Sequence, residues 1–125
     1  MAVRVMIVDD HEDVRFLIRA IIEDADEDVE VVGEADGVRA ALESIDALDP
    51  DVVVLDAVMP VVGGIEAAPM ILARRPRQTI LLCSALVDDE VRAKADQAGI
   101  SECVSKDDME AIPAIAVTLA RGSGP

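Results

Sequence analysis

Five short aliphatic runs, separated by segments with helical periodicity, constrain the fold of this chain more than any other feature of its sequence. The runs cover residues 3–8, 29–32, 52–55, 80–83 and 100–104. Their spacing of about 20 to 28 residues accommodates one strand and one returning helix, the repeating unit of a parallel α/β sheet. A length of 125 residues suits one core. We therefore predict a single α/β domain with five parallel strands and five helices in a doubly wound sheet.

The composition of the runs indicates where each strand lies in the sheet. The third and fourth runs are continuously apolar, and the first is so from residue 5 onward, as strands buried on both faces are. The second run alternates Asp28, Val29, Glu30 and Val31, which is typical of a half-exposed edge strand. Hydrophobic residues make up 52% of the chain but aromatic residues only 1%. We therefore expect a core of aliphatic side chains.

The first two intervening segments carry clear helix signals. An apolar stripe with the spacing of an amphipathic helix is formed by Val14, Leu17, Ile18, Ile21 and Ile22. Asp10 precedes this stripe and is predicted to cap the helix. The second helix is predicted to end before Asp49 and Pro50, because a proline restricts the residue that precedes it.

Prolines and glycines indicate the bounds of the other helices. Pro69 falls inside the third predicted helix, where a proline costs about 3 kcal/mol, so we expect a late start or a kink. The fourth helix is predicted to run from Asp88 to Gly99, and Pro113 fits only the first turn of the fifth. Residues 1–121 are assigned to the domain and residues 122–125, "GSGP", to a linker or a frayed end.

Charge and composition exclude several classes of function. The 26 acidic residues against 11 Lys plus Arg give a net charge of -15, which repels nucleic acid and anionic lipid. The sequence has no signal peptide and no apolar segment near the about 20 residues of a membrane-spanning helix. Cys83 and Cys103 lack metal-binding spacing, so we expect buried reduced thiols. These features favour a cytoplasmic protein without direct contact to membranes or nucleic acid.

Polar side chains follow four of the five predicted strands. Asp9 and Asp10 end the first, Asp56 the third, Ser84 the fourth and Lys106 the fifth. Because the carboxyl ends of parallel strands meet at one edge of a sheet, we expect these side chains to converge. Each has a purely structural alternative, such as a helix cap, a turn or a solvated charge. The same placement on four strands favours a shared chemical role.

Clustered carboxylates require a cation, because unit charges about 4 Å apart interact by about 4 kcal/mol at an effective dielectric of 20. Oxygen ligands that also admit a phosphate group suit Mg²⁺. A carboxylate beside Mg²⁺ and Lys106 can attack a phosphoryl group, since both cations offset the charge on the phosphoryl oxygens. Ser84 can then donate a hydrogen bond to the product. The pattern therefore predicts a Mg²⁺-dependent phosphoacceptor site.

These residues, with the segments "VDDH" and "MPVVGG", resemble the receiver domain of two-component response regulators over residues 3–121. The resemblance implies a flavodoxin-like sheet in the order 2-1-3-4-5 and a histidine kinase as phosphodonor. The site residues that it implies are Asp56 as the phosphoacceptor, Asp9, Asp10 and the backbone carbonyl of Val58 as further Mg²⁺ ligands, Ser84 as the switch hydroxyl and Lys106 as the family's lysine.

The segment "VVGEADG" and an Asp after the lysine are most similar to the NarL/LuxR-type branch of that family. Members of this branch usually carry a C-terminal helix-turn-helix domain, which this sequence lacks. The resemblance therefore implies control of transcription through such a domain, and the chain is expected to be an excised or a stand-alone receiver.

One position departs from the family's pattern, and two further positions affect how long a phosphoryl group would persist. Cys103 stands where the family usually has the Tyr or Phe that turns inward when the hydroxyl engages phosphate. We expect a smaller switch through the Ser84 loop, and the alternative is partner binding that does not depend on phosphorylation. Val58 and Leu86 are expected to flank the phosphoryl group, and neither can hydrogen-bond an attacking water. We therefore predict slow self-dephosphorylation.

The leading hypothesis is a phosphoacceptor module that catalyses its own modification and is not a turnover enzyme. Its output is expected to be altered partner binding or dimerisation through the fourth and fifth helices, since the last helix has an unusually apolar exposed side. The rival hypothesis is a phosphorylation-independent interaction or dimerisation domain. A phosphohydrolase is weaker, because Val58 stands where such enzymes have a second acid. His11 is expected at the exposed start of the first helix, without a catalytic role.

Overall fold

Five parallel strands form one sheet in the order β2-β1-β3-β4-β5. The structure is a computed structural model in which residues 1–122 are described. The strands are β1 (Val3–Val8), β2 (Val29–Ala35), β3 (Val52–Asp56), β4 (Thr79–Ser84) and β5 (Glu102–Ser105). The helices are α1 (Glu12–Asp24), α2 (Val38–Leu48), α3 (Gly64–Arg74), α4 (Asp89–Gln97) and α5 (Ile112–Gly122), with a short 3₁₀ helix, η1 (Lys106–Ala111), before α5. The predicted strand order and flavodoxin-like fold are confirmed.

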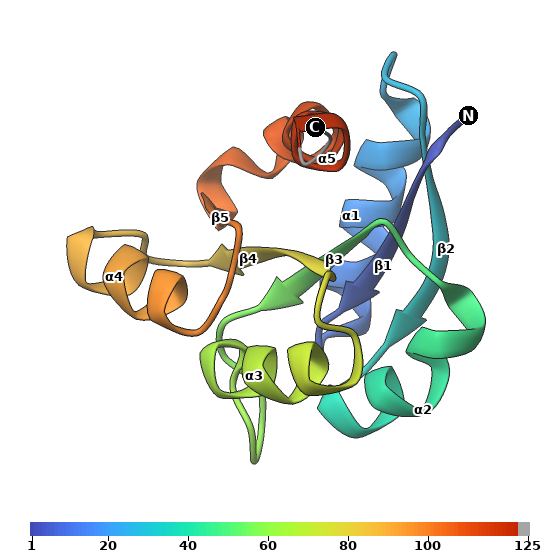
Figure 1. Cartoon of the computed structure of the whole chain (residues 1–125). Helices are drawn as coiled ribbons and strands as arrows, with labels where there is room; N and C mark the ends of the chain where they lie inside the picture. Colours follow the sequence, from blue (N-terminus) through green and yellow to red (C-terminus); the bar gives the residue numbers. More distant parts are fainter. Residues whose placement is uncertain (123–125) are drawn as a thin grey trace.

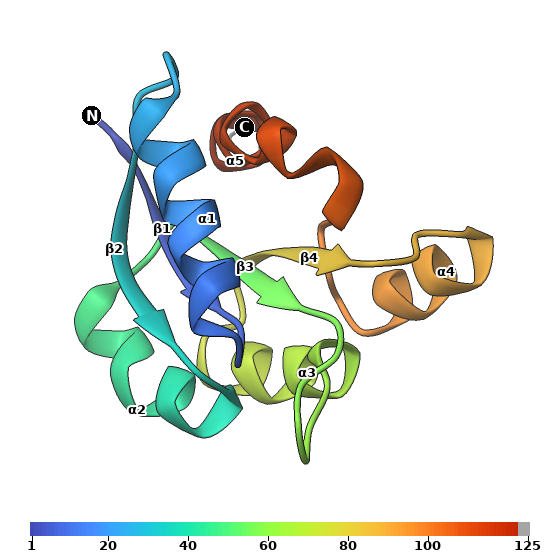
Figure 2. The same cartoon turned by 180° about the vertical axis from the view of Figure 1, so that it is seen from behind.

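Helices cover both faces of the sheet. Helices α1 and α5 lie on one face, and α2, α3 and α4 cover the other (Figures 1 and 2). The core has two aliphatic layers, one on each side of the sheet. The first layer includes Ile18, Ile22, Ile112 and Ala116, and the second includes Ala41, Ile45, Ile71 and Ala95. Because successive strand side chains alternate between the faces, each central strand contributes to both layers.

The apolar pattern of each strand matches its place in the sheet. All five residues of β3 are buried, since this strand lies between β1 and β4 with helices on both sides. Strand β2 lies at the edge and is mostly only half-buried, as its alternating sequence predicts. Of the helices in the described part of the chain, none is both long and apolar enough to cross a membrane.

Two predictions about helix ends are wrong. The N-cap of α1 is His11 rather than Asp10, and no side chain caps this helix. Asp9 instead accepts a hydrogen bond from the His11 backbone N–H at 2.8 Å, so the chain turns one residue later than predicted. Helix α3 lacks the predicted late start, because it begins at Gly64 and includes Pro69, whereas a kink at Pro69 stays a prediction. Its start is held by a hydrogen bond from the Gly64 N–H to the Ala57 carbonyl.

The other helix bounds agree with the sequence signals. Helix α2 ends at Leu48, before Asp49 and Pro50. The Asp88 side chain caps α4 by accepting from the Val91 N–H at 2.8 Å, and Gly99 follows this helix with a φ of 87°, a conformation that favours glycine. Pro113 lies in the first turn of α5. Gly122 ends α5, and residues 123–125 of the predicted linker or frayed end lie outside the described residues.

Gly64 lets α3 pack closely against the end of β3. A Cβ atom at this position would lie 2.2 Å from the Asp56 carbonyl oxygen and 2.9 Å from Leu82 Cδ1. Such distances are well below van der Waals contact, and the backbone oxygen cannot rotate away as a flexible side chain can. The absence of a side chain at Gly64 therefore determines how the Asp56 backbone is placed.

We expect Gly64→Ala to lower the free energy of unfolding by about 1–3 kcal/mol, because the added methyl group forces a backbone shift at Asp56. Gly37→Ser is the control, since nothing lies within 4 Å of a Cβ at Gly37 and serine is favoured at a helix N-cap. Urea unfolding followed by circular dichroism measures both. Equal stability of Gly64→Ala and the wild type would contradict this account of the packing.

Candidate functional site

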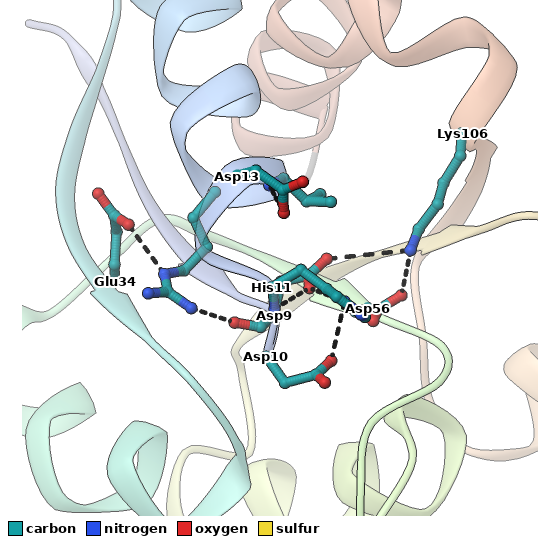
Figure 3. Close-up of polar contacts among 9 residues, drawn as sticks. Asp9, Asp10, His11, Asp13, Glu34, Asp56 and Lys106 are labelled. Carbon is teal, nitrogen blue, oxygen red and sulfur yellow. Dashed lines mark hydrogen bonds and ion pairs between the residues drawn. The ribbon is translucent and has the colours of Figure 1, made fainter.

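Three aspartates from two neighbouring strands converge at the carboxyl edge of the sheet (Figure 3). Asp9 and Asp10 directly follow β1, and Asp56 is the last residue of β3. With His11, they offer one ligand atom each, and these four atoms lie within 4.8 Å of one another. Asp9 and Asp56 are each only 2% exposed. The three carboxylates lie together at the strand ends, where the sequence analysis expects them. The imidazole of His11, which the sequence analysis does not include in the site, lies among them.

Lys106 supplies the positive charge at this site. Its Nζ atom lies 2.9 Å from Asp56 Oδ1 and 4.0 Å from Asp9 Oδ2 (Figure 3). The lysine is the first residue of η1, directly after β5, so its side chain crosses the sheet edge towards β3. The Ser105 hydroxyl oxygen accepts a hydrogen bond from the Asp107 N–H and caps η1. This cap holds the turn from which Lys106 extends.

Burial and mutual repulsion govern the charges of the cluster. Burial raises the pKa of Asp9, the backbone hydrogen bond from His11 opposes this, and the negative charge of Asp56 raises the pKa further. For Lys106, burial alone lowers the pKa, but its hydrogen bond to Asp56 and the nearby negative charges outweigh burial, so the pKa is raised. Lys106 is therefore a firmly held cation beside carboxylates that lack sufficient counter-charge.

The donor set of this cluster fits a divalent cation. Asp56 Oδ2 and Asp10 Oδ1 are buried and accept no hydrogen bond from any described residue. Buried carboxylate oxygens are normally paired, because an unpaired buried charge is costly. Clustered carboxylate oxygens are the ligands that Mg²⁺ prefers. Asp9, Asp10 and Asp56 can therefore hold such an ion, and the ion would satisfy Asp56 Oδ2, which the described residues leave without a partner.

Ser84 ends β4, the strand next to β3, and its hydroxyl group is hydrogen-bonded within the loop that follows β4. The hydroxyl donates a hydrogen bond to the Leu86 carbonyl oxygen at 2.8 Å, and its oxygen accepts one from the Leu86 N–H at 3.3 Å. Ser84 itself is 7% exposed. The structure places Ser84 at the edge of the sheet that the sequence predicts, and the hydroxyl must give up its hydrogen bond to the Leu86 carbonyl before it can donate to a group on Asp56.

Cys103 and the two residues expected to flank the phosphoryl group differ in exposure. Val58 is 75% exposed and Leu86 is 62% exposed, so both present apolar side chains at the surface of the edge loops. Cys103 is 8% exposed and belongs to the core layer under α2, α3 and α4. Burial raises the pKa of the Cys103 thiol and raises that of Cys83 to about 11. Both cysteines are therefore buried, protonated thiols, as predicted.

An arginine network beside the acids was missed at the sequence level. The Arg15 guanidinium donates to the Asp9 carbonyl oxygen at 2.7 Å and to Glu34 Oε1 at 3.0 Å. Arg19, one helical turn further along α1, donates to the other oxygen of Glu34 at 2.7 Å. The i, i+4 spacing of the two arginines was a usable signal. Their partner on β2 becomes evident only once the β1–β2 pairing is known.

Comparison with known proteins identifies the domain class. An open parallel α/β sheet with an acidic ligand site at its carboxyl edge is the arrangement of signalling receiver domains, and a family model described as the response regulator receiver domain matches residues 5–116. The chain belongs to this family. Receiver domains of the family take phosphoryl groups from histidine kinases and bind Mg²⁺ at an acidic pocket.

Individual relatives support the same assignment. The chain is 40% identical to the DNA-binding transcriptional activator DevR/DosR of Mycobacterium tuberculosis over 84% of this chain and 48% of that protein. It is 34% identical to the chemotaxis protein CheY of Listeria monocytogenes over 82% of this chain and 85% of that protein. The receiver domain of the response regulator NarL from M. tuberculosis superposes with a TM-score of 0.87 at 34% identity, covering 97% of this chain and 98% of that one.

These matches confirm the predicted family and its similarity to the NarL/LuxR-type branch. The chain spans most of the CheY relative but only 27% and 48% of the length of two longer relatives. The receiver domain is therefore the unit that these proteins share with this chain.

We expect Asp9→Asn to stabilise the metal-free protein at neutral pH by about 1–2 kcal/mol, because the amide removes a buried, poorly compensated charge. It keeps the oxygen that accepts from the His11 N–H. Thermal unfolding in the presence of a chelator measures the effect, which corresponds to several degrees in Tm. The exposed Asp26→Asn variant is the control for the loss of one negative charge.

The advantage of Asp9→Asn should depend on pH in a defined direction. The folded-state pKa of Asp9 is raised above its ordinary value of 3.8. Ionisation of Asp9 therefore lowers the free energy of unfolding as the pH rises from 3.8 through the raised pKa. Below this window the carboxyl is neutral in both states, and the variant and the wild type should converge. A variant that is no more stable than the wild type at neutral pH would contradict this account.

Proposed function

We propose that this domain accepts a phosphoryl group on Asp56 from a histidine kinase. The observation that carries the proposal is the state of Asp56, which is buried, ion-paired with Lys106 through Oδ1, and left without a hydrogen-bond partner at Oδ2. A buried carboxylate with one free oxygen next to a fixed ammonium group is suited to nucleophilic attack. In this proposal Asp9, Asp10, Asp56 and the backbone carbonyl of Val58 hold Mg²⁺.

The proposed transfer is an in-line displacement at phosphorus. One Asp56 oxygen forms the new O–P bond while the P–N bond of the kinase phosphohistidine breaks, and the departing imidazole nitrogen takes a proton from water. Lys106 stabilises charge on the phosphoryl oxygens, since its ammonium group is already held 2.9 Å from the carboxylate. Bound Mg²⁺ supplies further positive charge for those oxygens. The domain thereby catalyses its own phosphorylation without being a turnover enzyme.

The proposed readout begins at Ser84. After phosphorylation its hydroxyl exchanges the Leu86 carbonyl for a phosphoryl oxygen, which releases one of the two hydrogen bonds that hold the loop after β4. The buried Cys103 lacks a ring that could follow this movement, so the change stays small and is transmitted through the backbone before α4. We propose that the altered surface changes partner binding or dimerisation through α4 and α5.

The proposed setting is a cytoplasmic response regulator that controls transcription through a DNA-binding domain outside this chain. The chain is 40% identical to the DNA-binding activator DevR/DosR over 48% of that protein's length, which supports a role in the control of transcription. The net charge of -15 supports the absence of direct nucleic-acid binding by this segment. On α5, Ala114 and Thr118 are exposed, whereas Val117 packs against the core, so the proposed role of this helix in protein contacts rests on its small exposed side chains.

A second candidate function is an interaction or dimerisation domain that works without phosphorylation. The observation in its favour is Cys103, because a small buried thiol cannot couple the Ser84 loop to the α4 face by ring rotation. A phosphohydrolase is not supported, since Val58 is exposed and apolar at the position where a second acid would act.

Incubation with a small phosphodonor and Mg²⁺ tests the proposal. We expect the intact mass of the wild type to increase by one phosphoryl group and that of Asp56→Asn to stay unchanged, because the amide is a poor nucleophile. The exposed Asp26→Asn variant should be modified as the wild type is. Absence of an adduct at any Mg²⁺ concentration would favour the interaction domain, and continuous release of phosphate would favour the hydrolase.

The phosphorylated domain should lose its phosphoryl group slowly. Val58 and Leu86 flank the site in this proposal and offer no side-chain hydrogen bond to an attacking water. We expect Val58→Asn to accelerate the decay by roughly tenfold, or about 1.4 kcal/mol in activation free energy, because the amide can orient that water. Loss of the adduct over time is followed by intact mass. Val61→Asn, at a fully exposed position of the same loop, is the control, and equal decay rates of Val58→Asn and the wild type would refute the proposed role of Val58.

A further inference from the structure

The one histidine of the chain lies inside the acidic cluster. His11 Nδ1 is 3.2 Å from Asp9 Oδ1 and 3.2 Å from Asp10 Oδ1 (Figure 3). The His11 backbone N–H also donates to Asp9 Oδ1 at 2.8 Å, which fixes the start of the side chain beside the carboxylates. The imidazole therefore directs its Nδ1 atom towards the same space as the aspartate oxygens.

The spacing of these atoms matches that of neighbouring metal ligands. Ligand atoms about 2.0–2.2 Å from a metal ion lie about 3 Å apart when their bonds meet at right angles, and slightly further apart in a tetrahedral site. The two 3.2 Å separations from His11 Nδ1 fall in this range. The complete set of Asp9, Asp10, His11 and Asp56 stays within 4.8 Å. Opposite ligands in a shell with bonds of about 2.2 Å are at most about 4.4 Å apart, so the four atoms, which come from the loop after β1 and the end of β3, need to approach one another only slightly to share one ion.

The buried oxygens provide an independent indication of a ligand. Asp56, of whose side chain only 1% is exposed, directs Oδ2 into the cluster, where no described residue donates a hydrogen bond to it. Asp10 Oδ1 is also buried, and His11 Nδ1 lies 3.2 Å from it. A carboxylate oxygen in this state needs a cation, and Lys106 approaches Asp56 through the other oxygen, Oδ1.

We propose that this site also takes an imidazole-binding divalent ion such as Zn²⁺, with His11 Nδ1 as a ligand beside the three carboxylates, and that His11 sets the metal preference of the domain. The inference rests on the proposed phosphoacceptor site, because it uses the same aspartates. Mg²⁺ binds oxygen ligands and gains little from an imidazole, whereas Zn²⁺ binds imidazole nitrogen strongly. A site with one nitrogen and three oxygen ligands therefore prefers Zn²⁺ over Mg²⁺ more strongly than a receiver site with oxygen ligands alone.

Other possible Zn²⁺ ligands are poorly placed to compete. Cys83 and Cys103 are both buried, and burial raises the pKa of each thiol, which disfavours the thiolate that binds metal. Among the described residues, the only group of three or more His, Cys, Asp or Glu side chains arranged to hold a metal is the one around His11. A change at the His11 imidazole is therefore a specific signal for this site.

The test measures metal binding to the full chain labelled with ¹⁵N-histidine, stripped with a chelator and kept reduced. Calorimetric titrations give the Mg²⁺ and Zn²⁺ affinities of the wild type, His11→Asn and Asp56→Asn. We expect His11→Asn to weaken Zn²⁺ binding by about 10- to 100-fold and Mg²⁺ binding by less than about threefold. Asp56→Asn should weaken both. Zn²⁺, but not Mg²⁺, should shift the ¹⁵N resonance of Nδ1, which is unambiguous because the chain has 1 His.

Each outcome separates this inference from the proposed function. Equal Zn²⁺ affinities of the wild type and His11→Asn, or an unchanged Nδ1 resonance, would overturn the role of His11 and leave the Mg²⁺-dependent phosphoacceptor intact. A His11-dependent Zn²⁺ shift that persists in Asp56→Asn would also overturn it, since the ion would then lie elsewhere. Failure of Mg²⁺ to bind, with Zn²⁺ bound through His11, would support the inference and contradict the proposed Mg²⁺ chemistry.

Discussion

Repulsion among three carboxylates at one edge of the sheet is the constraint on which the rest of this structure depends. The strand order brings the ends of β1 and β3 together, so the fold itself holds the backbones of Asp9, Asp10 and Asp56 close to one another. At the 4.8 Å limit of their ligand atoms, each pair of charges interacts by about 3 kcal/mol at an effective dielectric of 20. Lys106 offsets part of this repulsion through one oxygen of Asp56. The remaining charge is what makes the site receptive to a divalent cation.

The surrounding protein keeps the acids in place despite that cost. The central strands are buried on both faces by aliphatic layers. Burial of this apolar surface stabilises the folded state and offsets the electrostatic repulsion at the site. Gly64 allows α3 to pack against the Asp56 backbone, and Arg15 ties the Asp9 carbonyl to Glu34 on the edge strand. The acid cluster that serves the function therefore destabilises the folded state, and packing in the rest of the domain compensates for it. This is a common arrangement at active sites.

Much of this arrangement could be predicted from the sequence, because periodicity reports burial directly. The continuously apolar runs identified the central strands, the alternation around Val29 identified the edge, and the strand ends identified Asp56 and Lys106. Local features that depend on backbone dihedral angles, side-chain rotamers or strand register could not be predicted. The cap of α1 moved to His11 because Asp9 turns the backbone there. The hydroxyl direction of Ser84 and the Arg15–Glu34 contact depend on rotamers and strand register, which spacing does not encode.

The dependence of thermal stability on Mg²⁺ tests the central claim most directly. If the carboxylates form a site that lacks positive charge, Mg²⁺ binds the folded state and stabilises it by RT ln(1 + [Mg²⁺]/Kd). Tm should then rise with the logarithm of Mg²⁺ concentration at constant ionic strength, and the rise should be largely lost in Asp56→Asn. A wild-type Tm that does not respond to Mg²⁺, or one that rises equally in Asp56→Asn, would contradict the account.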